Sequence, residues 1–417
     1  MKTIQGHDVK IFTDNIEESA INQIKELLSI DVFADKKIRI MPDVHAGAGC
    51  VIGFTGNLGD KVIPNIVGVD IGCGMRILNL GKISGIDYHA FNEHIRGNVP
   101  SGKIVREDRF GFKPLSGIEM DIYREAKKLV TELYCYRDLK DSARINKSIG
   151  SLGGGNHFIE LDKDDNGNVY LVIHTGSRNL GKQVAEIYQA KAIKHLTAGA
   201  DELEETIRRT IDEYKAAGRR EELQNVIKKM RREQQVAKPT LPAELCYLEG
   251  KGREEYLHDM RLCQRWAVLN RKLISILLLC FFPDVKVIDE FESIHNYISD
   301  DNIIRKGSIS AARGERCIIP LNMRDGSLLC TGKGNPDWNC SAPHGAGRVL
   351  SRSQAYEKIT MEDFEASMSG IYSESINDFT RDESPMVYKP AKEIIDNIGD
   401  TVDINTIIRP IFNFKAS

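Results

Sequence analysis

Five histidines lie beside glycine or asparagine in short segments spread over most of the chain. They are His45, His157, His174, His295 and His344. Each one alone fits an ordinary loop histidine, because imidazole is common on protein surfaces. Their shared setting beside Gly-rich segments favours a common site, since such loops let polar side chains converge on one point.

The segment 68–74, with the sequence GVDIGCG, holds the strongest single pattern. Its three glycines let the backbone turn tightly enough to aim the carboxylate of Asp70 and the thiolate of Cys73 at one point. A set of oxygen, nitrogen and sulfur ligands suits Mn²⁺, Zn²⁺ or Co²⁺, and the sulfur disfavours Mg²⁺. The alternative is a buried cysteine in a turn beside a helix-capping aspartate.

Two other Gly-rich loops, 153–156 and 345–348, offer backbone N–H groups to an anion, and the second adds the guanidinium of Arg348. Neither matches the P-loop, and residues 47–53 lack the dinucleotide-binding spacing. Turn geometry alone is the alternative interpretation of each.

A two-metal site beside phosphate-binding loops suits displacement at phosphorus. This pattern does not choose between hydrolysis and ligation. His344, flanked by Pro343 and Gly345, could attack a nucleotide's α-phosphorus and carry the nucleotide covalently. The lysine-based K-x-D-G signature of nucleotidyl transfer is absent from the sequence.

The elements expected to position these residues are short strands bordered by glycine, together with helices. The strand predictions are residues 38–41, 75–80, 158–161, 169–173 and 318–321. Asp14 and Glu17 predict a capping box at the start of a helix. Residues 185–282 read as helical, and 201–235 as a solvated, charge-balanced hairpin. We expect an α+β fold with mixed sheets, one catalytic domain over 1–417 and a helical insertion at 185–282.

Composition excludes collagen-like, mucin-like and disordered proteins. The 417 residues are 41% hydrophobic, with 57 basic and 60 acidic side chains and a net charge of −3, so nucleic-acid contact requires a local basic surface. No secretory signal opens the chain, and no apolar run is long enough for a membrane span. Nine cysteines without a CxxC pair fit a reducing compartment. We expect a cytoplasmic protein with no membrane partner.

The sequence closely resembles the RtcB family of RNA-splicing ligases over about residues 40–415. The matching segments are PDVH at 42–45, GVDIGCGM at 68–75, GNHFIE at 155–160, HTGSR at 174–178, HNY at 295–297, RKG at 305–307, HGAGR at 344–348 and YK at 388–389. Separated motifs in family order are far more specific than any one of them.

The resemblance implies a GTP-dependent enzyme that joins RNA 3′-phosphate or 2′,3′-cyclic phosphate ends to 5′-hydroxyl ends. It implies two Mn²⁺ ions and a histidine–GMP intermediate, in tRNA splicing or RNA repair. The RNA ends are the expected partners, and an archease-type activator is a candidate partner.

The resemblance also assigns roles by motif. It places one Mn²⁺ on Asp70, Cys73 and His157, and the other on Cys73, His174 and His295. It makes His344 the nucleophile, with Asp43 as an orienting partner. The residues expected around GTP are Asn156, Glu160, Asn296, Asn322, His344, Gly345, Ala346, Gly347, Tyr388 and Lys415. Those expected to bind RNA or phosphate are Arg178, Lys306, Arg348 and Arg352.

One segment departs from the family pattern. Family members usually have Pro-Gly-Ser-Met-Gly, with the serine near guanine, whereas residues 320–326 read PLNMRDG. Asn322 offers an amide in place of the lost hydroxyl, or the loop is reshaped for another substrate.

Two other functions remain open at this stage. The first is a two-metal phosphodiesterase or phosphatase without the covalent nucleotide step. The second is a non-catalytic RNA-binding protein, which would tolerate loss of His344 and Cys73.

Overall fold

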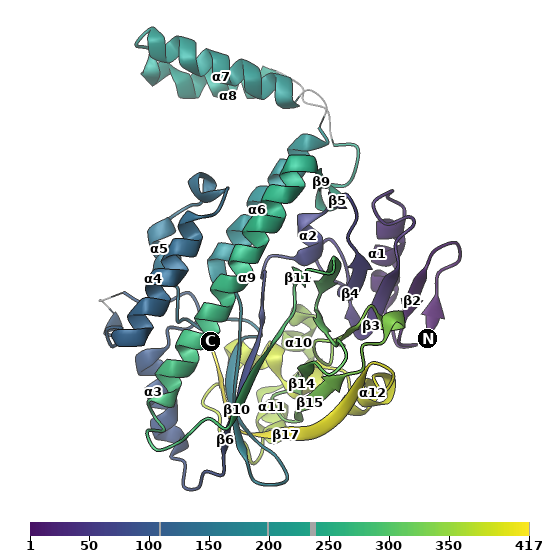
Figure 1. The fold of residues 1–417 in the computed structure, drawn as a ribbon, viewed down its shortest axis with the longest axis vertical. Helices are drawn as coiled ribbons and strands as arrows, with labels where there is room; N and C mark the ends of the chain where they lie inside the picture. Colours follow the sequence, from purple (N-terminus) through teal and green to yellow (C-terminus); the bar gives the residue numbers. More distant parts are fainter. Residues whose placement is uncertain (108–109, 198–199, 234–238, 417) are drawn as a thin grey trace.

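The computed structural model describes residues 1–107, 110–197, 200–233 and 239–416. Within them, two large sheets and a set of helices form a single α+β domain (Figure 1). No helix among the described residues is long and apolar enough to cross a membrane.

The larger sheet has seven strands, and every neighbouring pair in it runs antiparallel. In spatial order they are β10 (Asp289–Ile294), β6 (Gly74–Gly81), β8 (Val169–Thr175), β7 (Phe158–Lys163), β17 (Val402–Lys415), β15 (Gly326–Gly332) and β14 (Arg316–Asn322).

The central strand β8 is buried at every residue because both faces of the sheet are covered. Leu171 and Ile173 pack into a core with Phe91 of helix α3 and Ile274 of helix α9. Val172 belongs to a second core on the opposite face. This period of two is the pattern that a strand imposes on its side chains.

The second sheet has six strands and contains one parallel pair, β2 with β3. Its strands in order are β1 (Lys2–Thr3), β2 (Val9–Ile11), β3 (Ile38–His45), β4 (Ile52–Asn57), β12 (Ile303–Lys306) and β11 (Tyr297–Ile298). Two further pairs are β13 (Ser308–Ser310) with β16 (Ser341–Pro343), and β5 (Lys61–Val62) with β9 (Leu248–Glu249).

Helices cover the sheets and form one long projection. They are α1 (Glu18–Leu28), α2 (Pro64–Val67), α3 (Tyr88–Asn98), α4 (Gly117–Thr131), α5 (Ser142–Lys147), α6 (Arg178–His195), α7 (Ala200–Ala216), α8 (Leu223–Glu233), α9 (Gly250–Leu279), α10 (Arg352–Lys358), α11 (Met361–Ser367) and α12 (Ala391–Asn397). The longest, α9, packs against α4, α6 and β8. Short 3-10 helices include η6 (Asp378–Glu383) and η7 (Pro385–Val387).

All five predicted strands are present, each extended by one or more residues. The predicted capping box at Asp14 and Glu17 is wrong. Helix α1 begins at Glu18, and Glu17 at its N-cap makes no capping hydrogen bond. The carboxylate of Glu17 instead accepts a hydrogen bond from the backbone N–H of Ala46 at 2.7 Å. Glu17 therefore makes a tertiary contact in place of the predicted contact with the start of the helix.

The helical character of residues 185–282 is confirmed in the described part, with two differences. Helix α6 begins earlier, at Arg178, and the short strand β9 interrupts the helices just before α9. Helices α7 and α8 form the expected hairpin, which projects from the rest of the molecule at the top of Figure 1. The last predicted hairpin residues, 234 and 235, lie outside the described residues.

The hairpin starts and ends at one place on the body. The backbone N–H of Thr240 donates to the carbonyl of Leu196 at 3.4 Å, so the two chain segments that flank the hairpin already lie together. We predict that replacing residues 198–238 with a short Gly-Ser loop changes the melting temperature of the remaining domain by less than about 3 °C, because the loop closes a short gap. Calorimetry measures this change, and a large loss of stability would show that the hairpin supports the core.

Candidate active site

The candidate ligand residues converge on one edge of the larger sheet. Cys73 and His157 directly precede β6 and β7, His174 is the second-last residue of β8, and His295 directly follows β10. Because these four neighbouring strands run antiparallel, the starts of β6 and β7 meet the ends of β8 and β10. The register pairs His174 with Met75 on one side and Phe158 on the other.

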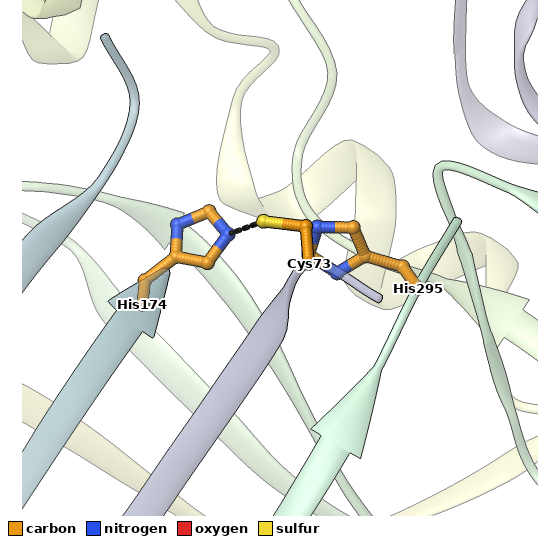
Figure 2. A group of neighbouring side chains, drawn as sticks. All are labelled: Cys73, His174 and His295. Carbon is orange, nitrogen blue, oxygen red and sulfur yellow. Dashed lines mark hydrogen bonds between the residues drawn. The ribbon is translucent and has the colours of Figure 1, made fainter. Parts of the chain in front are cut away.

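The side chains form two overlapping groups that share the Cys73 thiol. One group is Asp70, Cys73 and His157, the other is Cys73, His174 and His295, and within each group the ligand atoms lie within 4.8 Å of one another. The Sγ atom of Cys73 lies 3.5 Å from Nε2 of His157 and 3.3 Å from Nε2 of His174. Figure 2 shows Cys73, His174 and His295 turned toward one another from three neighbouring strands.

Backbone carbonyls orient two of the imidazoles. Nδ1 of His157 lies 2.9 Å from the carbonyl of Leu152, and Nδ1 of His174 lies 3.1 Å from the carbonyl of Asn156. A carbonyl only accepts, so each Nδ1 carries the proton. Nε2 of His174 therefore presents a lone pair to the site, whereas Nε2 of His157 lies 2.9 Å from Oδ2 of Asp70. Metal-binding histidines are held in the same way.

Burial decides the charges of this cluster. It lowers the pKa of His174 and of His295 well below the usual range, so both rings are neutral ligands. Burial, reinforced by the charge of Asp70, raises the pKa of the Cys73 thiol well above its ordinary value. Burial also opposes the charge of Asp70, but the hydrogen bond from His157 brings its pKa below normal.

The cluster fits a metal ion by its donors. Oδ1 of Asp70 is buried and has no hydrogen-bond partner among the described residues. A cation placed there would occupy this free oxygen and would favour the thiolate, which burial alone disfavours. One carboxylate, one thiol and three imidazoles together match a borderline transition-metal ion.

His344 lies beside this cluster, with its ring centroid 4.8 Å from that of His295. Its Nδ1 lies 2.7 Å from Oδ2 of the fully buried Asp43, which also accepts the backbone N–H of His344 at 3.2 Å. This pair fixes the tautomer and leaves Nε2 without a hydrogen bond to the described residues. The ring is therefore arranged as an oriented nucleophile.

The cluster and His344 open into a cavity of about 590 Å³. Among its lining residues are Asn156, Glu160, Asn296, Asn322, Gly345, Ala346, Gly347, Arg348, Arg352, Tyr388 and Lys415. All the residues expected around GTP therefore line one space. His45 also lines it, with Nδ1 2.9 Å from the carbonyl of Asp43. Burial raises the pKa of Glu160 to about 7, and Nδ2 of Asn413 donates to its carboxylate.

Glu383 is a buried, charged lining residue that motif matching missed. Only 1% of it is exposed, and it accepts hydrogen bonds from Tyr388 at 2.7 Å and from Nζ of Lys415 at 3.0 Å. Arg348 and Arg352 pair with its other oxygen at 3.3 and 3.2 Å. Burial opposes the charge of Glu383, but these cations hold its pKa at about 2. The signal in the sequence was an acidic residue five positions before Tyr388, which nothing local distinguishes from a surface glutamate.

Two of the expected phosphate-binding residues do not line the cavity. Nζ of Lys306 donates to the carbonyls of Ala48 and Asn65 and is buried. The guanidinium of Arg178 donates to the carbonyl of Gly102 at 2.9 Å and to Oγ of Ser151 at 3.3 Å. In this state both side chains support loops around the ligand cluster.

Two lining amides are already engaged by the protein. Oδ1 of Asn322 accepts from the backbone N–H groups of Arg324 and Asp325, and its Nδ2 donates to the Asp325 carboxylate at 2.8 Å. The amide closes its own turn, so it has little capacity to replace a serine hydroxyl. Asn296 accepts from the N–H of Gly307 at 2.8 Å and donates to the carbonyl of Asp70 at 3.3 Å.

The fold and the site together define an α+β protein with a buried cluster that can hold metal ions beside an oriented histidine. The model of the family described as tRNA-splicing ligase RtcB matches residues 23–416. The chain therefore belongs to the RtcB family, and it is an RNA ligase, as its motifs predicted.

Relatives from bacteria and archaea agree. The chain is 27% identical to the RNA-splicing ligase RtcB of Escherichia coli strain K12, over 99% of this chain and 98% of that protein. It is 25% identical to the tRNA-splicing ligase RtcB of Aeropyrum pernix, over 89% and 86% of the two chains. It is 26% identical to the RNA-splicing ligase RtcB of Mycobacterium tuberculosis, over 85% and 91%.

Gly153 tests how tightly the site is packed. Its φ is +94°, and a Cβ there would lie 1.7 Å from Nη1 of Arg178 and 2.8 Å from Nδ1 of His157. We predict that Gly153→Ala lowers the free energy of unfolding by about 1 to 3 kcal/mol, because of the left-handed backbone and the clash. The neighbour Gly154 is the control, since its nearest Cβ contact is 3.7 Å and its φ is not positive. Equal urea denaturation midpoints for the two alanine variants would contradict the packing argument.

Glu383 provides a pH-dependent test. Its pKa falls from 4.5 to about 2 on folding. The stability that its charge contributes is thus fully present above pH 4.5 and is lost as the pH falls through 2. We predict that Glu383→Gln lowers the free energy of unfolding at pH 7 by about 3 kcal/mol, and that the difference from wild type shrinks below pH 4. The exposed Glu357→Gln serves as control. A pH-independent difference would contradict the ionic origin of the effect.

Proposed function

We propose that this RNA ligase is GTP-dependent and joins RNA 3′-phosphate or 2′,3′-cyclic phosphate ends to 5′-hydroxyl ends through a histidine–GMP intermediate. The observation that carries the proposal is the Asp43–His344 pair beside the thiol–imidazole cluster. Asp43 holds the proton on Nδ1, so Nε2 is the atom that meets phosphorus.

From an RNA 3′-phosphate the reaction proceeds in three displacements, and a 2′,3′-cyclic phosphate is first opened to the 3′-phosphate by water. Nε2 of His344 attacks the α-phosphorus of GTP, forming a P–N bond and releasing pyrophosphate. An oxygen of the RNA 3′-phosphate then displaces His344 and forms a phosphoanhydride with GMP. The 5′-hydroxyl attacks the RNA phosphorus, forms the phosphodiester and expels GMP. Activation converts a poor leaving oxygen into a good one.

Two Mn²⁺ ions are the metals that we assign to the cluster. Asp70, Cys73 and His157 would hold one, and Cys73, His174 and His295 the other, in agreement with the two groups of ligand atoms. When bound, these ions supply Lewis acidity and balance the phosphate charges that meet at the site. The buried thiol supports Mn²⁺ over Mg²⁺, because sulfur disfavours Mg²⁺.

The nucleotide lies in the cavity. Glu160, whose neighbours are Lys415 and Asn413, is suited to bind the N–H edge of guanine. Tyr388 and Lys415 both bind the carboxylate of Glu383, so Tyr388 belongs to the same part of the cavity. Gly345, Ala346 and Gly347 would contact the phosphates together with Asn156 and Asn296. Asn322 contributes through the shape of its turn. Arg348 and Arg352 would contact RNA, and the same role for Arg178 and Lys306 stays a prediction.

The wider assignments rest on the same family membership. We propose one catalytic domain over 1–417 with 185–282 as a helical elaboration, tRNA splicing or RNA repair as the role, and the cytoplasm as the location. An archease-type activator stays a prediction.

The covalent step has a direct test. We predict that protein incubated with Mn²⁺ and α-labelled GTP retains label on His344, stable in alkali and lost in acid as expected of a phosphoramidate. Mass spectrometry would locate a GMP increment on the peptide that contains His344. His344→Ala removes the label, whereas the partly exposed His258→Ala, which lies outside the cavity lining, retains it.

The orienting role of Asp43 is tested in the same assay. Asp43→Asn keeps the size of the side chain but removes the charge that stabilises the Nδ1 proton, so labelling slows by about 10²- to 10⁴-fold. Turnover of phosphate esters without any adduct in wild type would instead identify a two-metal hydrolase.

A further inference from the structure

The aromatic side chain of Phe379 is exposed to solvent near the cavity. Phe379 in η6 is 79% exposed. Its backbone is held on both sides, because its N–H donates to Oδ1 of Asn377 at 2.9 Å and its carbonyl accepts from the hydroxyl of Tyr356 at 3.2 Å. The ring is therefore presented by a fixed backbone without being packed, which gives it no part in the core.

Tyr356 connects this ring to the cavity. It lies on α10, one helical turn after Arg352, so the two side chains share a face of the helix. Both bind the buried Asp382, Tyr356 through its hydroxyl at 3.2 Å and Arg352 through Nη1. Arg352 itself lines the cavity that contains His344.

Cations accompany the two rings. Arg352 is 54% exposed, and the guanidinium of Arg381 lies 5.5 Å from the centroid of the Tyr356 ring. The nearby carboxylate of Asp378 pairs with Arg381 at 3.5 Å, so the charge of Arg381 reduces its repulsion of RNA phosphates. Arg352, which lines the cavity, is therefore connected through Asp382 to Tyr356, and the hydroxyl of Tyr356 is connected to the backbone of Phe379.

We propose that Tyr356 and Phe379, called here the aromatic platform, bind the bases of single-stranded RNA whose 3′-phosphate enters the cavity. The proposal rests on the proposed function, because it takes His344 to be the place where the RNA 3′-phosphate is activated. Base stacking on exposed rings beside cations is the mode by which proteins hold single strands without reading their sequence.

Three observations favour RNA over a protein partner. The aromatic platform is continuous with the cavity of an RNA ligase. Arg352 and Arg381 lie beside Tyr356, which suits bases linked by phosphates. The hydroxyl of Tyr356 binds the backbone of Phe379, and charged side chains lie next to both residues, whereas an apolar docking surface for a protein would offer a wider patch without interleaved charges.

Binding of a labelled single-stranded RNA ending in a 3′-phosphate, followed by fluorescence anisotropy, tests the aromatic platform. Phe379→Ala and Phe379→Leu should each raise Kd by about 5- to 100-fold, and Phe379→Trp should keep wild-type affinity, because a stacking face is what matters. Since none of these changes removes a charge, the slope of log Kd against log salt should stay the same. Tyr134→Ala, at a 64% exposed tyrosine outside the cavity lining, is the matched control.

RNAs carrying one abasic nucleotide at successive positions from the 3′ end locate the contact. In wild type one position should weaken binding, and the same position should have no effect in Phe379→Ala. Additive losses at every position, or wild-type affinity of Phe379→Ala, would overturn the proposal and point to a protein partner for this surface. GMP labelling of wild type and Tyr134→Ala, measured in parallel, tells failure of the aromatic platform apart from failure of the proposed function.

Discussion

The buried thiol of Cys73 is the constraint on which the site depends. Burial and the charge of Asp70 both oppose its ionisation, so the thiolate requires positive charge brought to the same point. His174 and His295 cannot supply this charge, because burial lowers the pKa of both rings and keeps them neutral. The donors are therefore uncharged or difficult to ionise, and a cation bound among them would favour the thiolate and occupy the unpaired oxygen of Asp70.

A second buried charge, Glu383, organises another part of the cavity lining. It binds Tyr388, which lies nearby in the sequence, together with Lys415, Arg348 and Arg352 from other segments. The carboxylate neutralises cations that would otherwise repel one another, and it holds them where a nucleotide and RNA phosphates are proposed to lie. The carboxylate also offsets part of the positive charge of these three cations, so arriving phosphates compete with Glu383 for the arginines.

The antiparallel sheet explains why chemistry gathers at one edge. Strands that alternate in direction bring starts and ends together, so residues more than two hundred positions apart, such as Cys73 and His295, become neighbours. Lys415 reaches the same edge at the end of β17, opposite Phe158. The projecting α7–α8 hairpin takes no part in this arrangement, which agrees with its balanced charges in the sequence.

The sequence by itself determined the five strands and the helical character of the insertion, and it named the candidate ligand residues that the fold brings together, because periodicity and Gly-rich motifs are local and the motifs are specific to one family. Only the tertiary structure decided the rest. The contact of Glu17 with Ala46 replaced a predicted helix cap, and the amide of Asn322 turned out to close its own loop. Glu383 and Phe379 carry no local signal, since a buried ionic centre and an exposed ring differ from ordinary residues only in what surrounds them, and those surroundings come from distant parts of the chain.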